Sequence, residues 1–85
     1  MILFSAPACD KCTYIKKNFN LKELGIRVEE LTEDNPEGLA LLAWHGLVKR
    51  VEEGLPILVV EKEKLVIRGQ ENIVKYLERK KRDAN

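Results

Sequence analysis

The chain has 85 residues, a formal net charge of +1 at pH 7 and charged side chains at 34% of its positions. A chain of this length is expected to form one domain, residues 1–85, with a modest core, because such domains bury only about 60% or slightly more of their unfolded surface. The near-neutral charge gives no general reason to bind nucleic acid or an anionic membrane. Its apolar runs, MILF and LPILVV, are too short for a signal peptide or a membrane span. We therefore expect a monomeric, cytoplasmic protein.

The first half of the chain predicts a strand, a helix and a second strand. Apolar residues at three- and four-residue steps indicate the helix, at Cys12, Ile15 and Phe19, with Leu24 as a candidate extension. Gly25 is a good helix terminator. The expected elements are a buried strand at 1–5, a helix from about Cys9 and a second strand at 26–31.

The second half predicts a helix, a hairpin of two strands and a last helix. Asn35 is a favoured N-cap and Pro36 suits the first helical position, and Gly46 marks a kink or an end inside the helix. The expected elements are a helix at 36–53, strands at 55–61 and 64–69, and a helix from Gln70. The inward side of the first of these helices is predicted to carry Leu39, Leu42, Ala43, Leu47 and Val51.

This order, β-α-β-α-β-β-α, predicts an α/β fold with a four-stranded mixed sheet and helices on both faces. The first two strands should be parallel, with a right-handed crossover. The last two should form an antiparallel hairpin, because their connection is too short for a crossover. Cys9 then lies just beyond the C-terminal end of the first strand, where open α/β sheets usually bind ligands.

Cys9 and Cys12 are the only cysteines. In a reducing cytoplasm a permanent structural disulfide is unusual, so the close pair indicates catalysis or metal binding. The attacking species in disulfide exchange is a thiolate, and the start of a helix stabilises negative charge. We therefore expect Cys9 to be the exposed nucleophile, helped by Lys11 and opposed by Asp10 if that carboxylate points toward it. Cys12, one helical turn later, faces inward and resolves the mixed disulfide.

Two alternatives use the same thiols. One is a metal carrier or an adaptor that binds through the cysteine pair. Zinc usually takes four ligands, and the pair together with the distant His45 supplies three at most, although a dimer could share two pairs. The other alternative is a disulfide with no redox role. Redox exchange is the favoured interpretation, because the pair follows a strand within a β-α-β unit.

The stretches ILFSAPACDKC, LPILVV and VIRGQENI together resemble the glutaredoxin branch of the thioredoxin-fold superfamily over nearly the whole chain. The resemblance implies a thioredoxin-like fold and a dithiol–disulfide oxidoreductase that needs no cofactor and serves electron transport and cell redox homeostasis. It implies that Pro56 follows a cis peptide bond beside the dithiol and that the Leu55 backbone pairs with the substrate chain. It also implies that Gly69 and Gln70 receive a carboxylate of glutathione.

The sequence departs from this family at several positions. Asp10-Lys11 replaces Pro-Tyr between the cysteines, Ala6 replaces a lysine, and Glu71 introduces an acid beside Gly69-Gln70. Substrates are therefore expected to be disulfide-containing proteins or small molecules, with glutathione or a thioredoxin-reductase-like flavoenzyme as the electron donor. Lys11 and Tyr14 are predicted to line the rim of the substrate site.

Overall fold

The computed structural model describes residues 1–51 and 54–83. The predicted element order is confirmed, except that the second helix is divided in two and the polar turn between the last two strands is a short 3-10 helix. The elements are β1 (Ile2–Ser5), α1 (Asp10–Asn18), β2 (Arg27–Glu30), α2 (Pro36–Trp44), α3 (Val48–Val51), β3 (Ile57–Val60), η1 (Glu61–Glu63), β4 (Leu65–Arg68) and α4 (Gln70–Asp83). Among the described residues, no helix is both long enough and apolar enough to cross a membrane.

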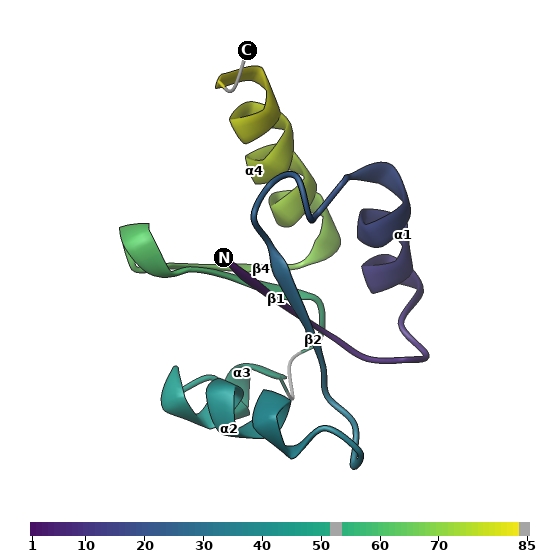
Figure 1. The fold of residues 1–85 in the computed structure, drawn as a ribbon, viewed down its shortest axis with the longest axis vertical. Helices are drawn as coiled ribbons and strands as arrows, with labels where there is room; N and C mark the ends of the chain where they lie inside the picture. The colour runs from purple at the N-terminus through teal and green to yellow at the C-terminus, as the bar shows by residue number, and fades with distance from the viewer. Residues whose placement is uncertain (52–53, 84–85) are drawn as a thin grey trace.

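The four strands form one mixed sheet in the order β2-β1-β3-β4. β1 pairs in parallel with β2, and Leu3 lies opposite Val28. β3 pairs antiparallel with β1, placing Leu58 opposite Leu3, and also with β4. The parallel first pair and the antiparallel hairpin are thus both confirmed (Figure 1). β1 is central, so the loop that follows it and carries Cys9 leaves from the middle of the sheet.

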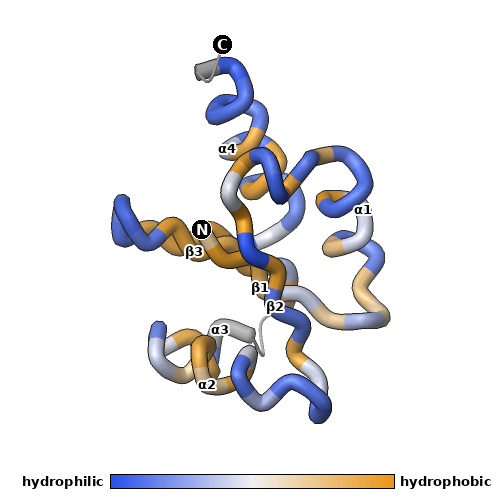
Figure 2. Tube along the Cα trace, in the orientation of Figure 1, coloured by the Kyte–Doolittle hydropathy of each residue, from blue (hydrophilic) through white to orange (hydrophobic). Residues whose placement is uncertain are grey.

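Helices cover both faces of this sheet, as predicted. Alternate strand residues point to opposite faces, and each face carries its own apolar cluster. One cluster joins Leu3 and Leu58 to α1 and α4 through Ile15, Ile73 and Leu77. The other joins Ile2 and Phe4 of β1 and Ile57 and Val59 of β3 to Leu42 and Leu47. In Figure 1, α1 and α4 lie on one side of the strands and α2 and α3 on the other, and Figure 2 shows β1 and β3 as strongly apolar.

α1 is shorter than the sequence predicts, because it ends at Asn18. The next residue, Phe19, is extended (φ −133°, ψ 140°), and the Asn18 side chain donates a hydrogen bond to the Tyr14 carbonyl at 2.7 Å. Asparagine side chains compete in this way with the hydrogen bonds that would continue a helix. The proposed extension to Leu24 is therefore wrong, although Leu24 packs against the core from the turn that follows.

The predicted interruption at Gly46 is the end of α2. Gly46 has a φ of +68°, in the left-handed region where a side chain is unfavourable. Its N–H donates to the Ala43 carbonyl at 3.0 Å, and the Leu47 N–H donates to the Leu42 carbonyl at 3.1 Å. These two bonds form a Schellman motif, in which the residue after the glycine contacts the last turn of the helix. Leu47 and Leu42 are both buried in the same cluster, so the chain turns back onto the sheet at this point.

The buried side of α2 is displaced from the predicted one. Leu42 and Leu47 are buried as expected, but Ala43 is exposed and Leu39 is 48% exposed, and the Val51 side chain lies outside the described residues. Gly38 is buried instead, and a Cβ there would lie 3.2 Å from the Glu30 carbonyl oxygen. This close approach of the helix backbone to the end of β2 turns Gly38 and Leu42 inward, and thereby turns Leu39 and Ala43 outward.

Asn35 occupies the predicted N-cap position without making the side-chain cap hydrogen bond. Its Nδ2 donates instead to Glu29 Oε2 and to the Glu30 carbonyl, each at 2.9 Å. Glu29 is only 5% exposed and also pairs with Arg27. A buried carboxylate needs such partners, so Asn35 links the start of α2 to the end of β2.

A polar cluster joins the hairpin end to α4. Tyr76 donates its hydroxyl to Glu63 Oε2 at 3.2 Å, and Lys80 Nζ donates to Glu63 Oε1 at 3.1 Å. The hydrogen bond from Lys80 lowers the pKa of Glu63, and burial raises the pKa of Tyr76. These contacts lie on the face of the sheet that α4 covers, and they hold η1 against that helix.

Candidate functional site

The two cysteines lie where β1 gives way to α1. Cys9 is the N-cap residue of α1, with extended backbone angles (φ −116°, ψ 103°), and its Sγ accepts the N–H of Cys12 at 3.2 Å. A disulfide joins Cys9 to Cys12, whose Cα atoms lie 5.3 Å apart, within the usual range for such a bond. The prediction that the helix begins at about Cys9 is confirmed.

The cysteines differ in their access to solvent. Cys12 is fully buried (0% exposed), whereas Cys9 is half-buried. Cys12 belongs to the inward side of α1 together with Ile15, as the three-residue spacing predicts. A molecule that approaches from solvent therefore meets the Cys9 sulfur first.

The backbone around Cys9 is held by the first turn of α1. Both the N–H and the hydroxyl of Thr13 donate to the Cys9 carbonyl at 3.0 Å. The Cys9 sulfur thus sits at the positive end of the helix, with a backbone N–H directed at it. In the reduced protein this position favours the thiolate, because helix N-termini stabilise negative charge.

The Leu55–Pro56 peptide bond is cis, as the resemblance implied. Pro56 is buried, and its carbonyl accepts the Gly69 N–H at 3.1 Å, which ties the chain before β3 to the residue before α4. Leu55 is half-buried and lines a pocket of about 240 Å³ with Lys11 and Gly69, together with Gly54 and Arg68. The predicted substrate-binding residues Leu55, Lys11 and Gly69 thus come together from three parts of the chain.

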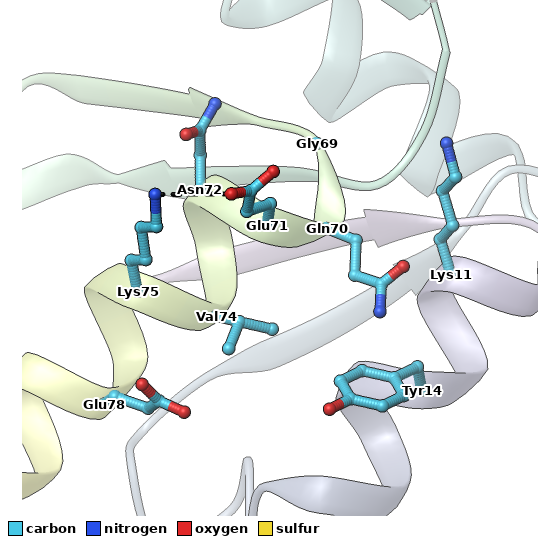
Figure 3. Close-up of a pocket in the computed structure, with 9 residues that line it drawn as sticks. All are labelled: Lys11, Tyr14, Gly69, Gln70, Glu71, Asn72, Val74, Lys75 and Glu78. Carbon is cyan, nitrogen blue, oxygen red and sulfur yellow. Dashed lines mark ion pairs between the residues drawn. The ribbon is translucent and has the colours of Figure 1, made fainter.

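A larger pocket of about 760 Å³ lies between α1 and the start of α4. It contains four of the predicted site residues, which are Lys11, Tyr14, Gly69 and Gln70. Figure 3 shows the Gln70 side chain pointing from α4 toward α1, which carries Lys11 and Tyr14. Lys11 and Gly69 line both pockets, so the two hollows adjoin at these residues.

Most of the α4 side of this pocket was not predicted from the sequence. The additional lining residues are Asn72, Val74, Lys75 and Glu78, and they join the Glu71 already noted. The spacing of 71, 74, 75 and 78 is that of one helical face, which is the signal that could have identified them. Lys75 Nζ pairs with Glu71 Oε1 at 3.3 Å (Figure 3). With Lys11 and Glu78 added, positive and negative side chains are balanced around the pocket.

His45 lies apart from the cysteine pair. It is the C-cap residue of α2, which covers the face of the sheet opposite to α1 (Figure 1). Among the side chains described, those of residues 1–49 and 54–82, no three of His, Cys, Asp or Glu are gathered as they would be to hold a metal ion. A metal bound by the thiols would therefore need ligands other than His45.

No family model, no curated protein and no solved structure matches this chain. The fold and the cysteine pair are the observations on which a function can be proposed.

Proposed function

We propose that the protein is a thiol–disulfide oxidoreductase that reduces protein or small-molecule disulfides through Cys9 and Cys12. The observation that carries this proposal is that the two cysteines differ in burial and in hydrogen bonding. Cys9 is half-buried and its sulfur accepts a helix N–H, while Cys12 is fully buried one turn later. Disulfide exchange needs one thiol that the substrate disulfide can reach. It also needs a second thiol that reacts only with the mixed disulfide formed on the first.

The reaction follows from these positions. The Cys9 thiolate attacks one sulfur of the substrate disulfide, and the other substrate sulfur leaves as a thiolate with the bonding electron pair. Cys12 then attacks the Cys9 sulfur of the mixed disulfide. The second substrate thiolate leaves, and the Cys9–Cys12 disulfide forms. Two electrons and two protons pass from the dithiol to the substrate, so the step requires no cofactor.

The pockets support a binding mode for the substrate chain. Leu55 and Pro56 would hold its backbone beside Cys9, and Lys11, Tyr14, Gly69 and Gln70 would form the far rim. The balanced charge of the larger pocket gives glutathione, an anionic thiol, no general electrostatic preference. Glutathione and a thioredoxin-reductase-like flavoenzyme are the two electron donors to compare.

We further propose that the fold is thioredoxin-like, of the glutaredoxin type. The support is the mixed sheet in the order β2-β1-β3-β4, the helices on both of its faces and the position of the cysteine pair at the first strand-to-helix junction. The cysteine pair lies at the C-terminal end of β1, next to the parallel β2, where α/β sheets commonly place their sites.

Insulin reduction with dithiothreitol as the donor tests the proposal. Wild type is expected to accelerate the reduction, and Cys9→Ser is expected to remove the acceleration. Cys12→Ser, mixed with insulin after dithiothreitol has been removed, is expected to accumulate a stable mixed disulfide on Cys9, detected by its mass. His45→Asn, on the opposite face of the sheet, is the control and should retain full activity.

Two results would contradict the oxidoreductase. One is a Cys9→Ser variant that works as fast as wild type. The other is stoichiometric copper or zinc in protein purified without oxygen, accompanied by dimerisation, which would favour a metal carrier.

A further inference from the structure

Ser5 is a buried polar residue that the proposed reaction does not yet use. It is the last residue of β1, and its exposed fraction is 0%. Among the side chains that the structure describes, those of residues 1–49 and 54–82, its Oγ is the one buried nitrogen or oxygen that lacks a hydrogen-bond partner. Leaving a buried hydroxyl unpaired costs free energy, and such a group calls for a reason.

The register of β1 places the Ser5 side chain on the face of the sheet that α1 covers. Alternation along β1 puts Ser5 on the same face of the sheet as Leu3, which packs with Ile15 of α1. Cys12 precedes Ile15 by three residues and is buried on the same side of α1. Cys12 also lies in the first turn of α1, which is the end nearest to the last residue of β1. The Ser5 hydroxyl and the Cys12 sulfur are therefore enclosed in the same layer, at the same end of it.

The redox state of the cysteines changes the hydrogen bonds that a sulfur in this layer can form with a hydroxyl. A thiol donates and accepts weak hydrogen bonds, and a thiolate is a charged acceptor that forms stronger ones. In the disulfide, Cys12 is bonded to Cys9, and the Ser5 hydroxyl has no hydrogen-bond partner in the described structure. Reduction makes the Cys12 sulfur a thiol that can donate as well as accept, or a thiolate that accepts more strongly, in a site closed to water.

We propose that Ser5 is a positioning residue for Cys12, whose sulfur its hydroxyl hydrogen-bonds in the dithiol state but not in the disulfide state. This inference rests on the proposed function, since it assigns a partner to the resolving thiol. In the resolving step the hydroxyl donates to the Cys12 thiolate as that sulfur attacks Cys9. Ser5 keeps its own proton, the departing substrate thiolate takes the electron pair of the broken bond, and the proton released by Cys12 goes to that thiolate.

The test compares the dithiol–disulfide equilibrium of Ser5→Ala with that of wild type in dithiothreitol redox buffers. Removing the hydroxyl should cost the reduced state a hydrogen bond and relieve the disulfide state of an unpaired buried group. Both effects shift the equilibrium toward the disulfide, by roughly tenfold in all, which is a potential about 30 mV more negative. Ser5→Thr keeps the hydroxyl and should restore the wild-type potential. His45→Asn, at the C-cap of α2 on the opposite face of the sheet, is the control and should leave the potential unchanged.

A merely structural role for Ser5 would leave the potential unmoved, and an unmoved or less negative potential in Ser5→Ala overturns the inference. If Ser5→Ala does not fold, the structure of reduced wild type decides instead. An Oγ within hydrogen-bonding distance of the Cys12 sulfur supports the inference, and a longer separation overturns it. The potential can be measured whether or not the protein reduces insulin, so a failure of the proposed function is recognised separately.

Discussion

Reducing the Cys9–Cys12 disulfide should leave the protein folded, with a small and calculable loss of stability. The bond closes a loop between residues only three apart in sequence. In the chain-entropy description, a loop of about four residues contributes about 2 kcal/mol to stability. Both apolar clusters are built from residues other than the two cysteines. The core therefore does not depend on the bond.

Guanidinium denaturation followed by far-UV circular dichroism, with and without dithiothreitol, measures this loss. For a domain of this size, about 2 kcal/mol corresponds to a melting temperature lower by about 8–16 °C. The Cys9→Ser/Cys12→Ser double variant is the control, and it should show the same stability in both buffers. A loss of about 5 kcal/mol or more, of the size that follows removal of a disulfide that holds a small domain together, would refute the reasoning. It would show that the bond is structural rather than a redox couple.

Three further results are expected. In reduced protein at neutral pH, iodoacetamide should alkylate Cys9 well before Cys12, because Cys12 is fully buried. Peptide mass spectrometry gives the order of alkylation, and equal labelling would contradict the roles of Cys9 as nucleophile and Cys12 as resolving thiol. Leu77→Ala is at a fully buried position of the apolar cluster that joins the sheet to α1 and α4, and it should lower the free energy of unfolding by about 2–5 kcal/mol. Leu39→Ala, on the exposed side of α2, should lower the free energy of unfolding by about 0.5 kcal/mol or less. Because burial raises the pKa of Tyr76 above its ordinary value, its contribution to stability should be complete below about pH 10 and fall as the pH rises through the folded-state pKa. Denaturation midpoints across that range should decline less steeply in Tyr76→Phe, and identical slopes would argue against the shift.

The order of the elements was predictable because their signals are local. The Schellman motif at Gly46 depends on a residue that tolerates a positive φ, and this tolerance is visible in the sequence. The start of α1 at Cys9 follows in the same way from the three- and four-residue spacing of apolar side chains. The end of α1 was misjudged because Asn18 and Asn20 form competing side-chain hydrogen bonds, which apolar periodicity does not register.

The buried side of α2 could not be predicted from periodicity alone. An α2 with Leu39 inward and an α2 with Gly38 inward have similar apolar patterns. The choice was made by the fit of the helix backbone against the end of β2, where Gly38 leaves room. The rotation of α2 about its axis depends on packing between elements that are distant in sequence. The same packing explains why the Asn35 side chain donates to Glu29 and does not cap its own helix.

The sequence by itself determined the α/β class, the strand-to-helix junction that makes Cys9 and Cys12 unequal, and the chemistry open to two thiols at that spacing. These properties depend on neighbouring residues and on backbone geometry, which are encoded locally. Only the tertiary structure joined α1 to the face of α4 that completes the larger pocket, set His45 across the sheet from the thiols, and enclosed the Ser5 hydroxyl without a partner. Enclosure and proximity arise when distant segments pack together, and no local pattern of residues specifies them.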